Sequence, residues 1–196
     1  MKKIPTLFER TFENHKVVGI SPNVTPGCER AFEEGEATIK FDGSCCAMIN
    51  GKFYKRYDAK GGKKVPEGGI PCCDPDPVTG HWPHWVPVDG NNTSDKWLIG
   101  AYENELKAGS AWARGGVLKN GTYEAVGPHF QGNPHCFEED ALLPHGMIFV
   151  GVDRSFEAIR KWLEEHEEEG LVFWLDGEPR CKIKRTDFGL DWPIKR

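Results

Sequence analysis

A tight hairpin in the first third of the chain constrains the fold more than any other stretch. Two runs with strand-forming residues, 45–49 and 52–57, meet at Asn50-Gly51, and Asn-Gly in this setting is the strongest short-range signal for a two-residue hairpin. A short strand precedes the hairpin, ends on Lys40 and runs into a turn that contains Gly43. Because glycine tolerates conformations that a side chain forbids, backbone and phosphate can approach closely at this turn. The stretch predicts antiparallel strands and a lysine at a strand end, which is a suitable seat for a nucleophile.

Further strand and turn signals extend this pattern along the chain. The 196 residues include 23 Gly and 14 Pro, which favours a fold with many turns over a helical bundle. We expect a single domain, 1–196, of α+β class with antiparallel sheets flanked by helices. The expected strands lie at 16–20, 36–40, 121–127, 147–152 (buried), 171–175 and 179–185, and Asp176-Gly177 is the turn signal between the last two. We also expect a loop over 65–95, a strand passing into a short helix at 96–101, and a helix that has Ser155 as its N-cap and runs to about 167.

Bulk composition excludes several classes of protein. No apolar run approaches the roughly 20 residues that a membrane-spanning helix needs, and the first residues lack the apolar stretch of a signal peptide. We therefore expect a cytoplasmic protein without membrane contact. The seven cysteines include two adjacent pairs, Cys45-Cys46 and Cys72-Cys73, which is poor disulfide architecture, so reduced thiols are expected.

Three local features have competing interpretations. Residues 52–64 are rich in lysine and arginine although the net charge is −5; this stretch is either a phosphate-binding patch or the solvated edge of a hairpin. The cluster Cys72, Cys73, His81 and His84 could hold zinc, but adjacent cysteines rarely reach one ion, which favours an ordinary loop. The aromatic residues around His81 could stack on bases or pack against the core.

A second group of chemically useful residues lies near the end of the chain. Lys182 and Lys184 are two apart on a predicted strand, so their side chains leave the same face. Glu169-Gly170 stands at the entry to the strand before it. Each feature is weak alone, and their order along the chain is the informative observation.

That order resembles the covalent nucleotidyltransferase superfamily, which comprises ATP-dependent RNA and DNA ligases and mRNA capping enzymes. The matching residues are Lys40-Phe41-Asp42-Gly43 for the first motif, Glu124 for the third, Phe149 for the aromatic position, Glu169-Gly170 for the fourth and Lys182-Ile183-Lys184 for the fifth. The resemblance runs from about residue 36 to 188 and implies an adenylation domain with an ATP-grasp-like arrangement.

The resemblance also implies roles for these residues. Lys40 would be the nucleophile that takes AMP from ATP, and Lys182 and Lys184 would contact the α-phosphate as further catalytic groups. The implied nucleotide-binding set is Ile39, Lys40, Arg56, Glu124 (ribose), Phe149 (purine), Glu169, Lys182 and Lys184. Glu169 would also support Mg²⁺ or Mn²⁺. The AMP would pass to an RNA 5′-phosphate, and an RNA 3′-hydroxyl would then displace it.

Within the superfamily, residues 40–44, the hairpin after them and residues 55–61 look most like small RNA ligases of the RNA-repair type. The chain also departs from the family pattern at two points. Cys45 stands where many relatives have arginine, so Arg56 is the candidate for the missing ribose or phosphate contact. Few residues follow the fifth motif, which leads us to expect no C-terminal oligonucleotide-binding (OB) domain. A monomer is expected. The alternatives are a DNA-nick ligase, a guanylyltransferase, a non-catalytic RNA-binding module and a zinc-stabilised interaction domain.

Overall fold

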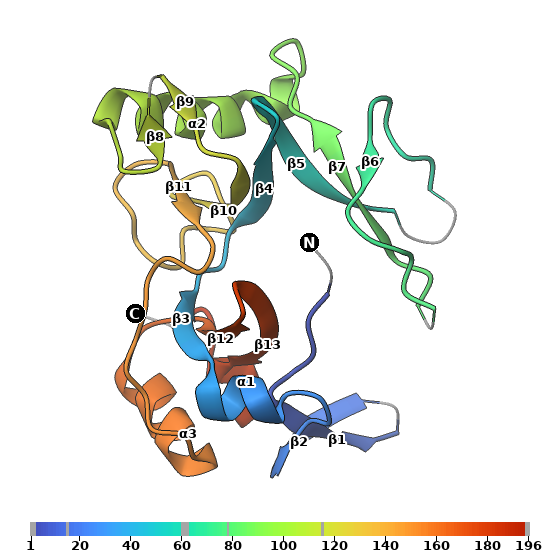
Figure 1. Ribbon diagram of the computed structural model, residues 1–196, viewed down its shortest axis with the longest axis vertical. Helices are drawn as coiled ribbons and strands as arrows, with labels where there is room; N and C mark the ends of the chain where they lie inside the picture. Colours follow the sequence, from blue (N-terminus) through green and yellow to red (C-terminus); the bar gives the residue numbers. More distant parts are fainter. Residues whose placement is uncertain (1–2, 15, 60–62, 78, 115, 195–196) are drawn as a thin grey trace. The chain divides into compact units, whose positions relative to one another are not determined.

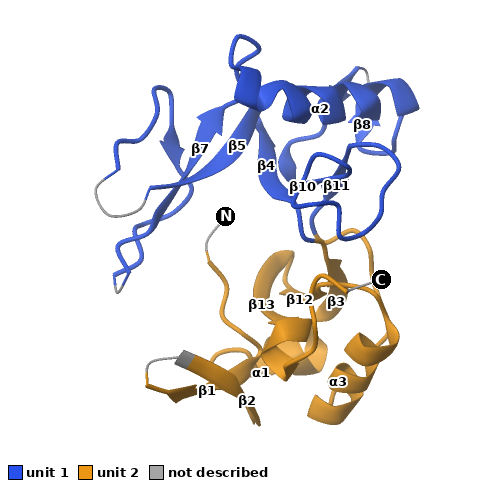
Figure 2. Ribbon diagram, turned by 180° about the vertical axis from the view of Figure 1, so that it is seen from behind, with its two compact units in different colours: residues 1–2, 42–145 blue, residues 3–41, 146–196 orange. Residues whose placement is uncertain are grey.

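The chain forms two compact units, which are described separately below (Figure 2). A computed structural model describes residues 3–14, 16–59, 63–77, 79–114 and 116–194. Unit 1 comprises residues 42–145, and unit 2 comprises residues 3–41 together with 146–194. The chain therefore passes between the units after Phe41 and after His145. The predicted α+β class with antiparallel sheets is confirmed, whereas the single domain and the ATP-grasp-like arrangement stay predictions.

Unit 1 is built on a six-stranded antiparallel sheet with the strand order β11-β10-β4-β5-β7-β6 (Figure 1). Its elements are β4 (Ser44–Ile49), β5 (Lys52–Ala59), β6 (Ile70–Pro71), β7 (Trp82–Pro87), η1 (Thr93–Asp95), α2 (Lys96–Ala108), β8 (Ala113–Arg114), β9 (Val117–Leu118), β10 (Gly121–Val126) and β11 (Ala141–Pro144). The predicted hairpin is confirmed: Asn50 and Gly51 join β4 to β5 with φ values of 50° and 74°. Positive φ at both positions is what a two-residue hairpin turn requires.

The two faces of this sheet have different environments. On one face, Cys46, Met48 and Tyr123 pack with Leu98 and Ala101 of α2. Since side chains alternate along a strand, the neighbouring positions Cys45 and Glu124 point to the opposite face. The face away from the helix therefore carries Glu124 beside an apolar cluster that includes Ala47 and Trp85.

The predicted loop over 65–95 is wrong in part, because it contains β6 and β7. Trp85 is only 6% exposed and packs with Ala47 and Tyr54, so tertiary burial stabilises a strand that the many prolines disguise. The run from His81 to Trp85 is thus mostly strand, and Lys60 of the basic stretch lies outside the described residues. Of the strand passing into a short helix that was expected at 96–101, the strand is wrong and the helix is confirmed, because α2 begins at Lys96.

Unit 2 contains a three-stranded antiparallel sheet in the order β13-β12-β3 and a β1-β2 hairpin. Its elements are β1 (Phe8–Glu13), β2 (Lys16–Val24), α1 (Glu29–Glu34), β3 (Glu36–Lys40), α3 (Phe156–Glu165), β12 (Gly170–Leu175), β13 (Glu178–Lys184) and η2 (Arg185–Phe188). The predicted cap is confirmed, since Ser155 Oγ accepts a hydrogen bond of 3.1 Å from the Ala158 N–H. The predicted Asp176-Gly177 turn is also confirmed, with φ values of 55° and 74°.

The buried strand predicted at 147–152 is wrong. Backbone hydrogen bonds of 2.9 Å, from Ile39 N–H to Ile148 O and from Val150 N–H to Ala37 O, hold this segment along β3. The pairing stops at one isolated bridge between Thr38 and Phe149. Phe149 is 57% exposed. An aromatic residue favours a buried strand, but here it is not packed into a core.

The three-stranded sheet also has two distinct faces. Leu171, Phe173 and Ile183 are fully buried on one face, in a core shared with α1 and α3. The alternate positions include Lys40 and Lys182, which leave from the other face. Among the described residues, no helix is long and apolar enough to cross a membrane.

Candidate active site

A glycine separates two lysines in the three-stranded sheet of unit 2. Gly170 of β12 is paired with Lys184 of β13 on one side and with Lys40 of β3 on the other. A Cβ at this glycine would lie 2.1 Å from the Ile183 carbonyl oxygen and 3.0 Å from the Lys184 Cα. The close approach of the strands therefore explains why glycine follows Glu169.

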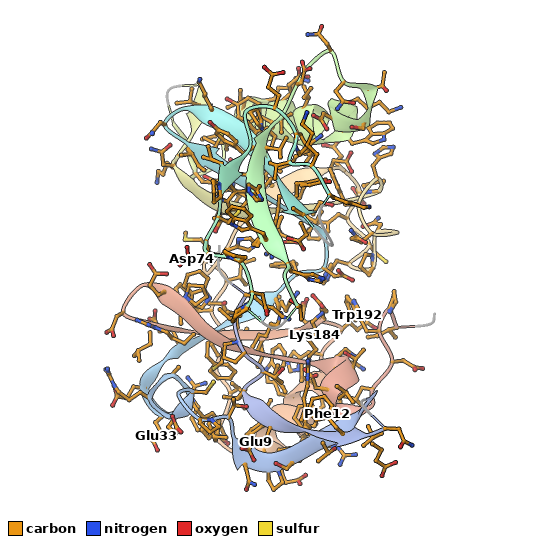
Figure 3. All side chains as sticks on the ribbon, turned by 90° about the vertical axis from the view of Figure 1, so that its right-hand side faces the viewer. Glu9, Phe12, Glu33, Asp74, Lys184 and Trp192 are labelled. Atoms are coloured by element: carbon orange, nitrogen blue, oxygen red, sulfur yellow. The ribbon has the colours of Figure 1, made fainter. Side chains whose placement is uncertain are left out.

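One buried carboxylate joins these two lysines. Glu169 is 3% exposed, and its Oε2 and Oε1 atoms pair with the Nζ atoms of Lys40 and Lys184, respectively. Its carbonyl oxygen accepts a 2.9 Å hydrogen bond from the Arg185 N–H, which fixes the start of the strand. The structure thus brings together three of the residues that the sequence predicts for the site; Lys184 is labelled in Figure 3.

Lys182 completes the cationic group in unit 2. It lies two residues before Lys184 on the same face of β13. Burial, reinforced by the charges of Lys40 and Lys184, lowers the pKa of Lys182 from 10.5 to about 8. At physiological pH, Lys182 is therefore neutral in a fraction of the molecules. The cluster of three lysines favours a negatively charged ligand.

The lowered pKa of Lys182 makes the stability of the chain depend on pH. Above pH 8 the unfolded state binds more protons at this lysine than the folded state does, so the free energy of unfolding should rise between about pH 8 and 10.5. We expect a contribution on the order of 2 kcal/mol after allowing for partial exposure. Urea titrations at several pH values should show that Lys182→Met loses this rise, whereas Lys161→Met, at an exposed helix position, keeps it. Equal pH dependence in wild type and Lys182→Met would contradict the prediction.

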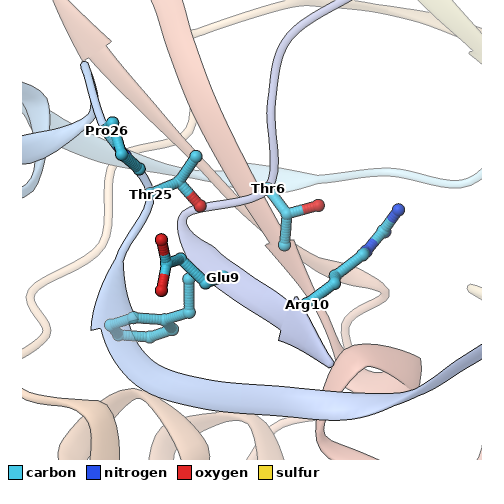
Figure 4. Close-up of a pocket in the computed structure, with 6 residues that line it drawn as sticks. Thr6, Glu9, Arg10, Thr25 and Pro26 are labelled. Carbon is cyan, nitrogen blue, oxygen red and sulfur yellow. The ribbon is translucent and has the colours of Figure 1, made fainter. Parts of the chain in front are cut away.

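Three supporting features in unit 2 were not predicted from the sequence. Residues 5–7 run along β13: the Lys182 N–H donates to Pro5 O at 3.0 Å, and the Leu7 N–H donates to Lys182 O at 2.7 Å. Asp187 Oδ2 accepts from the Lys184 N–H at 3.0 Å, and its Oδ1 accepts from Arg10 Nη2 at 2.9 Å. Arg10 also lines a shallow depression beside Thr6 (Figure 4). The backbone at Lys182 and Lys184 is therefore held by hydrogen bonds with residues 5–7 and with Asp187.

Phe149 and Ile39 are two further residues of unit 2 that the sequence predicts for the site, and the structure places them in contrasting positions. Phe149 is exposed beside Thr38, so it is free to contact a ligand rather than being part of the core. Ile39 alternates with Lys40 along β3, and its side chain points to the opposite face from the lysines. Any role of Ile39 toward a nucleotide would therefore be indirect or through its backbone.

Unit 1 presents a separate polar group around Glu124. Its Oε1 atom accepts a 3.1 Å hydrogen bond from the Gly43 N–H, and its Oε2 atom lies 2.8 Å from His145 Nε2. His145 Nδ1 in turn lies 2.9 Å from Thr122 Oγ1. A Cβ on Gly43 would lie 2.1 Å from the Ala125 carbonyl oxygen. Close packing, rather than an unusual φ angle, therefore requires glycine in the first motif.

The turn before Gly43 has a histidine partner that the sequence did not reveal. The Asp42 N–H donates a 2.9 Å hydrogen bond to His135 Nε2. His135 and His145 carry no local sequence signal, because each meets its partner only through the fold. The turn at Asp42 and Gly43 is therefore held by His135 and Glu124, which lie far along the chain in unit 1.

Cys45 and Arg56 lie near Glu124 on the sheet of unit 1. Cys45 is the cross-strand partner of Glu124. Burial raises the pKa of Cys45 to about 12; the Glu124 charge adds to the effect, and Arg56 opposes it. Arg56 Nε also donates a 3.1 Å hydrogen bond to Asp58 Oδ1. The nucleotide contact expected of Arg56 stays a prediction.

Metal binding at Glu169 is not supported by the local donor set. Both carboxylate oxygens pair with lysine ammonium groups, and a preformed divalent-cation site needs several free oxygen ligands. Over the described residues, the group of histidine, cysteine or acidic side chains with ligand atoms within 4.8 Å of one another is Cys45, Glu124 and His145. The alternative group of Cys72, Cys73, His81 and His84 does not form there. None of the seven cysteines, all of which lie in the described part of the chain, forms a disulfide.

A buried carboxylate shared by two lysines, with a third lysine of lowered pKa, defines a site suited to binding phosphate groups.

Three curated proteins named RNA ligase 1 are similar to this chain. The protein of Danio rerio is 30% identical over 154 residues, which cover 65% of this chain and 46% of its own length. Those of Pongo abelii and Rattus norvegicus are 24% and 25% identical over 225 residues, covering 80% and 81% of this chain and 68% of their own length.

These similarities confirm the predicted resemblance to RNA ligases. This chain spans about half the length of the Danio rerio relative, at 46%. No protein-family model matches it.

Proposed function

We propose that the chain is an ATP-dependent RNA ligase that joins RNA 5′-phosphate and 3′-hydroxyl ends. The observation that carries this proposal is the Lys40-Glu169-Lys184 ion-pair group beside Lys182. Similarity to proteins named RNA ligase 1 supports RNA as the substrate class. Monomeric state and cytoplasmic location stay predictions.

In the first step, Lys40 takes AMP from ATP. The Lys40 ammonium first passes one proton to Glu169 Oε2, with which it pairs. The resulting amine attacks the α-phosphorus, a P–N bond forms, the bond to the bridging oxygen breaks with pyrophosphate leaving, and the second Nζ proton passes to water. Lys182 and Lys184 stabilise the negative charge that develops on the α-phosphate.

The nucleotide contacts follow from the resemblance and from exposure. Glu124 accepts hydrogen bonds from the ribose hydroxyls, which requires it to exchange one of its present partners. Phe149 stacks on the purine, a role that its 57% exposure permits. Arg56 contributes positive charge to ribose or phosphate binding. Mg²⁺ or Mn²⁺ enters as the counter-ion of the ATP phosphates, and no step is assigned to a metal held by Glu169.

Two later steps join the RNA ends. An RNA 5′-phosphate oxygen attacks the Lys40-bound AMP, a phosphoanhydride forms, the P–N bond breaks, and the Lys40 nitrogen leaves as an amine that takes a proton. An RNA 3′-hydroxyl then attacks the activated 5′-phosphate, loses its proton and displaces AMP. The product is an ordinary phosphodiester.

A sealing assay separates this proposal from its alternatives. We expect ATP to support joining of 5′-phosphorylated RNA by the chain at least 10-fold better than GTP does, and nicked duplex DNA to be a poor substrate. Preference for nicked DNA would favour a DNA ligase, and covalent labelling by GTP would favour a guanylyltransferase. RNA binding that falls with salt, without covalent nucleotide or joined product, would leave a binding module.

A further inference from the structure

We propose that Cys45, Glu124 and His145 of unit 1 bind a thiophilic divalent cation such as Zn²⁺. These side chains come from three adjacent parts of one sheet: Cys45 and Glu124 are cross-strand partners on β4 and β10, and His145 follows β11. One sulfur, one carboxylate oxygen and one imidazole nitrogen lie within 4.8 Å of one another. The group combines the three ligand types that zinc prefers.

The geometry needs only small movements to hold one ion. Zinc–sulfur and zinc–nitrogen bonds of about 2.3 and 2.0 Å place two ligand atoms of a tetrahedral site roughly 3.5 Å apart. His145 Nε2 and Glu124 Oε2 lie 2.8 Å apart and have to separate slightly, whereas the sulfur of Cys45, which lies within 4.8 Å of both atoms, has to move inward. The side chains of Glu124 and His145 are 14% and 19% exposed, which leaves room for a water molecule as the fourth ligand.

Thr122 supplies the outer contact that a metal-bound histidine requires. Its Oγ1 atom lies 2.9 Å from His145 Nδ1. A threonine hydroxyl can accept as well as donate. Its oxygen can therefore accept a hydrogen bond from the Nδ1–H of His145, which leaves the lone pair of Nε2 for the metal. Ligand histidines commonly have their second nitrogen held in this way.

Charge and ligand softness determine which cation fits. Binding displaces the Cys45 proton, and the resulting thiolate and the Glu124 carboxylate together balance a charge of +2. A thiolate favours Zn²⁺, Co²⁺ or Cd²⁺ over Mg²⁺, which prefers oxygen ligands. The site is therefore distinct from one that would hold the magnesium of ATP.

Cobalt binding to the full chain tests the proposal directly. Reduced protein, free of added thiol, is titrated with Co²⁺, and the near-ultraviolet absorption of cobalt bound to thiolate is followed. We expect one equivalent to produce the band, Zn²⁺ to remove it, Cys45→Ser to abolish it and His145→Gln to weaken binding at least 10-fold. Cys136→Ser, which removes an exposed thiol outside the group, should leave the band unchanged.

Two results would overturn the site. They are the absence of a thiolate band in wild type and a band of full strength in Cys45→Ser. Near-ultraviolet circular dichroism checks that each variant is folded. If Cys45→Ser does not fold, the test is the cobalt affinity of His145→Gln, and an affinity equal to that of wild type would then overturn the site.

One consequence rests on the proposed function. If Glu124 binds the ribose, a metal on Glu124 should inhibit labelling by ATP in wild type more than in Cys45→Ser, each compared with its own metal-free rate. Cobalt binding is measured without nucleotide, so failure of the ligase proposal and failure of the metal site are distinguishable.

Discussion

Lys40→Ala should lose covalent labelling by α-labelled ATP by at least about 1000-fold, because no other group then occupies the nucleophile position. Lys40→Arg is the sharper variant. Its guanidinium keeps the positive charge and can still pair with Glu169, but it stays protonated and is not a nucleophile. We therefore expect both variants to be inactive when labelled protein is counted after a denaturing gel.

Lys161→Ala serves as the matched control for these variants. Lys161 is 72% exposed on α3, where it pairs with Glu165 at 3.7 Å. It should be labelled like wild type. Labelling of Lys40→Arg at the wild-type level would mean that Lys40 acts only through its charge.

Gly170→Ala should destabilise unit 2 and reduce labelling at the same time. The added methyl group would meet the Ile183 carbonyl at 2.1 Å, and backbone atoms on a paired strand have little room to move. We expect a loss of about 3 kcal/mol in the free energy of unfolding. The strain falls between Lys40 and Lys184, so the residual folded protein should also be labelled more slowly.

Urea denaturation followed by tryptophan fluorescence checks the stability part. Gly151→Ala is the control, since nothing lies within 4 Å of a Cβ at that position and its φ is ordinary for a side-chain-bearing residue. It should change stability by less than about 0.5 kcal/mol. A Gly170→Ala midpoint equal to that of Gly151→Ala would contradict the close packing described for β12 and β13.

The Lys40-Glu169-Lys184 group fits the role proposed for Lys40. The buried Glu169 carboxylate is stabilised by two ammonium groups. Under the proposed function, the phosphate groups of ATP would supply new negative charge to Lys184 and Lys182. Glu169 would then hold Lys40 in place and accept its proton, whereas a lysine on the solvated surface has no such partner.

Local signals in the sequence predicted the parts of the fold that local chemistry determines. The Asn50-Gly51 and Asp176-Gly177 turns and the Ser155 cap each depend on a few neighbouring residues, and the structure confirms them. Strand β7 was missed because its prolines argue against a strand until the burial of Trp85 is known. The segment at 147–152 failed in the opposite way, since its strand-forming residues find only one isolated bridge.

The candidate site shows the same division. Alternation along a strand predicted that Lys182 and Lys184 would share a face. That Glu169 would join them was predicted only from the order of the motifs, and its ion pair with Lys184 shows that it does. The partners His135 and His145 were not predictable, since their contacts join residues 93 and 21 positions apart. A lone histidine in a sequence gives no sign of the hydrogen bond that it will accept or donate.

Mapping the attached nucleotide tests the central claim most directly. Wild-type protein is incubated with ATP and Mg²⁺ or Mn²⁺, digested under conditions that preserve phosphoramidates, and analysed by tandem mass spectrometry. We predict AMP on the peptide that contains Lys40, at Lys40 itself, and its removal when pyrophosphate is added before digestion. AMP attached to Lys182, whose pKa of about 8 makes it the competing nucleophile, would contradict the assignment of Lys40, and no attached AMP on folded protein would contradict the ligase.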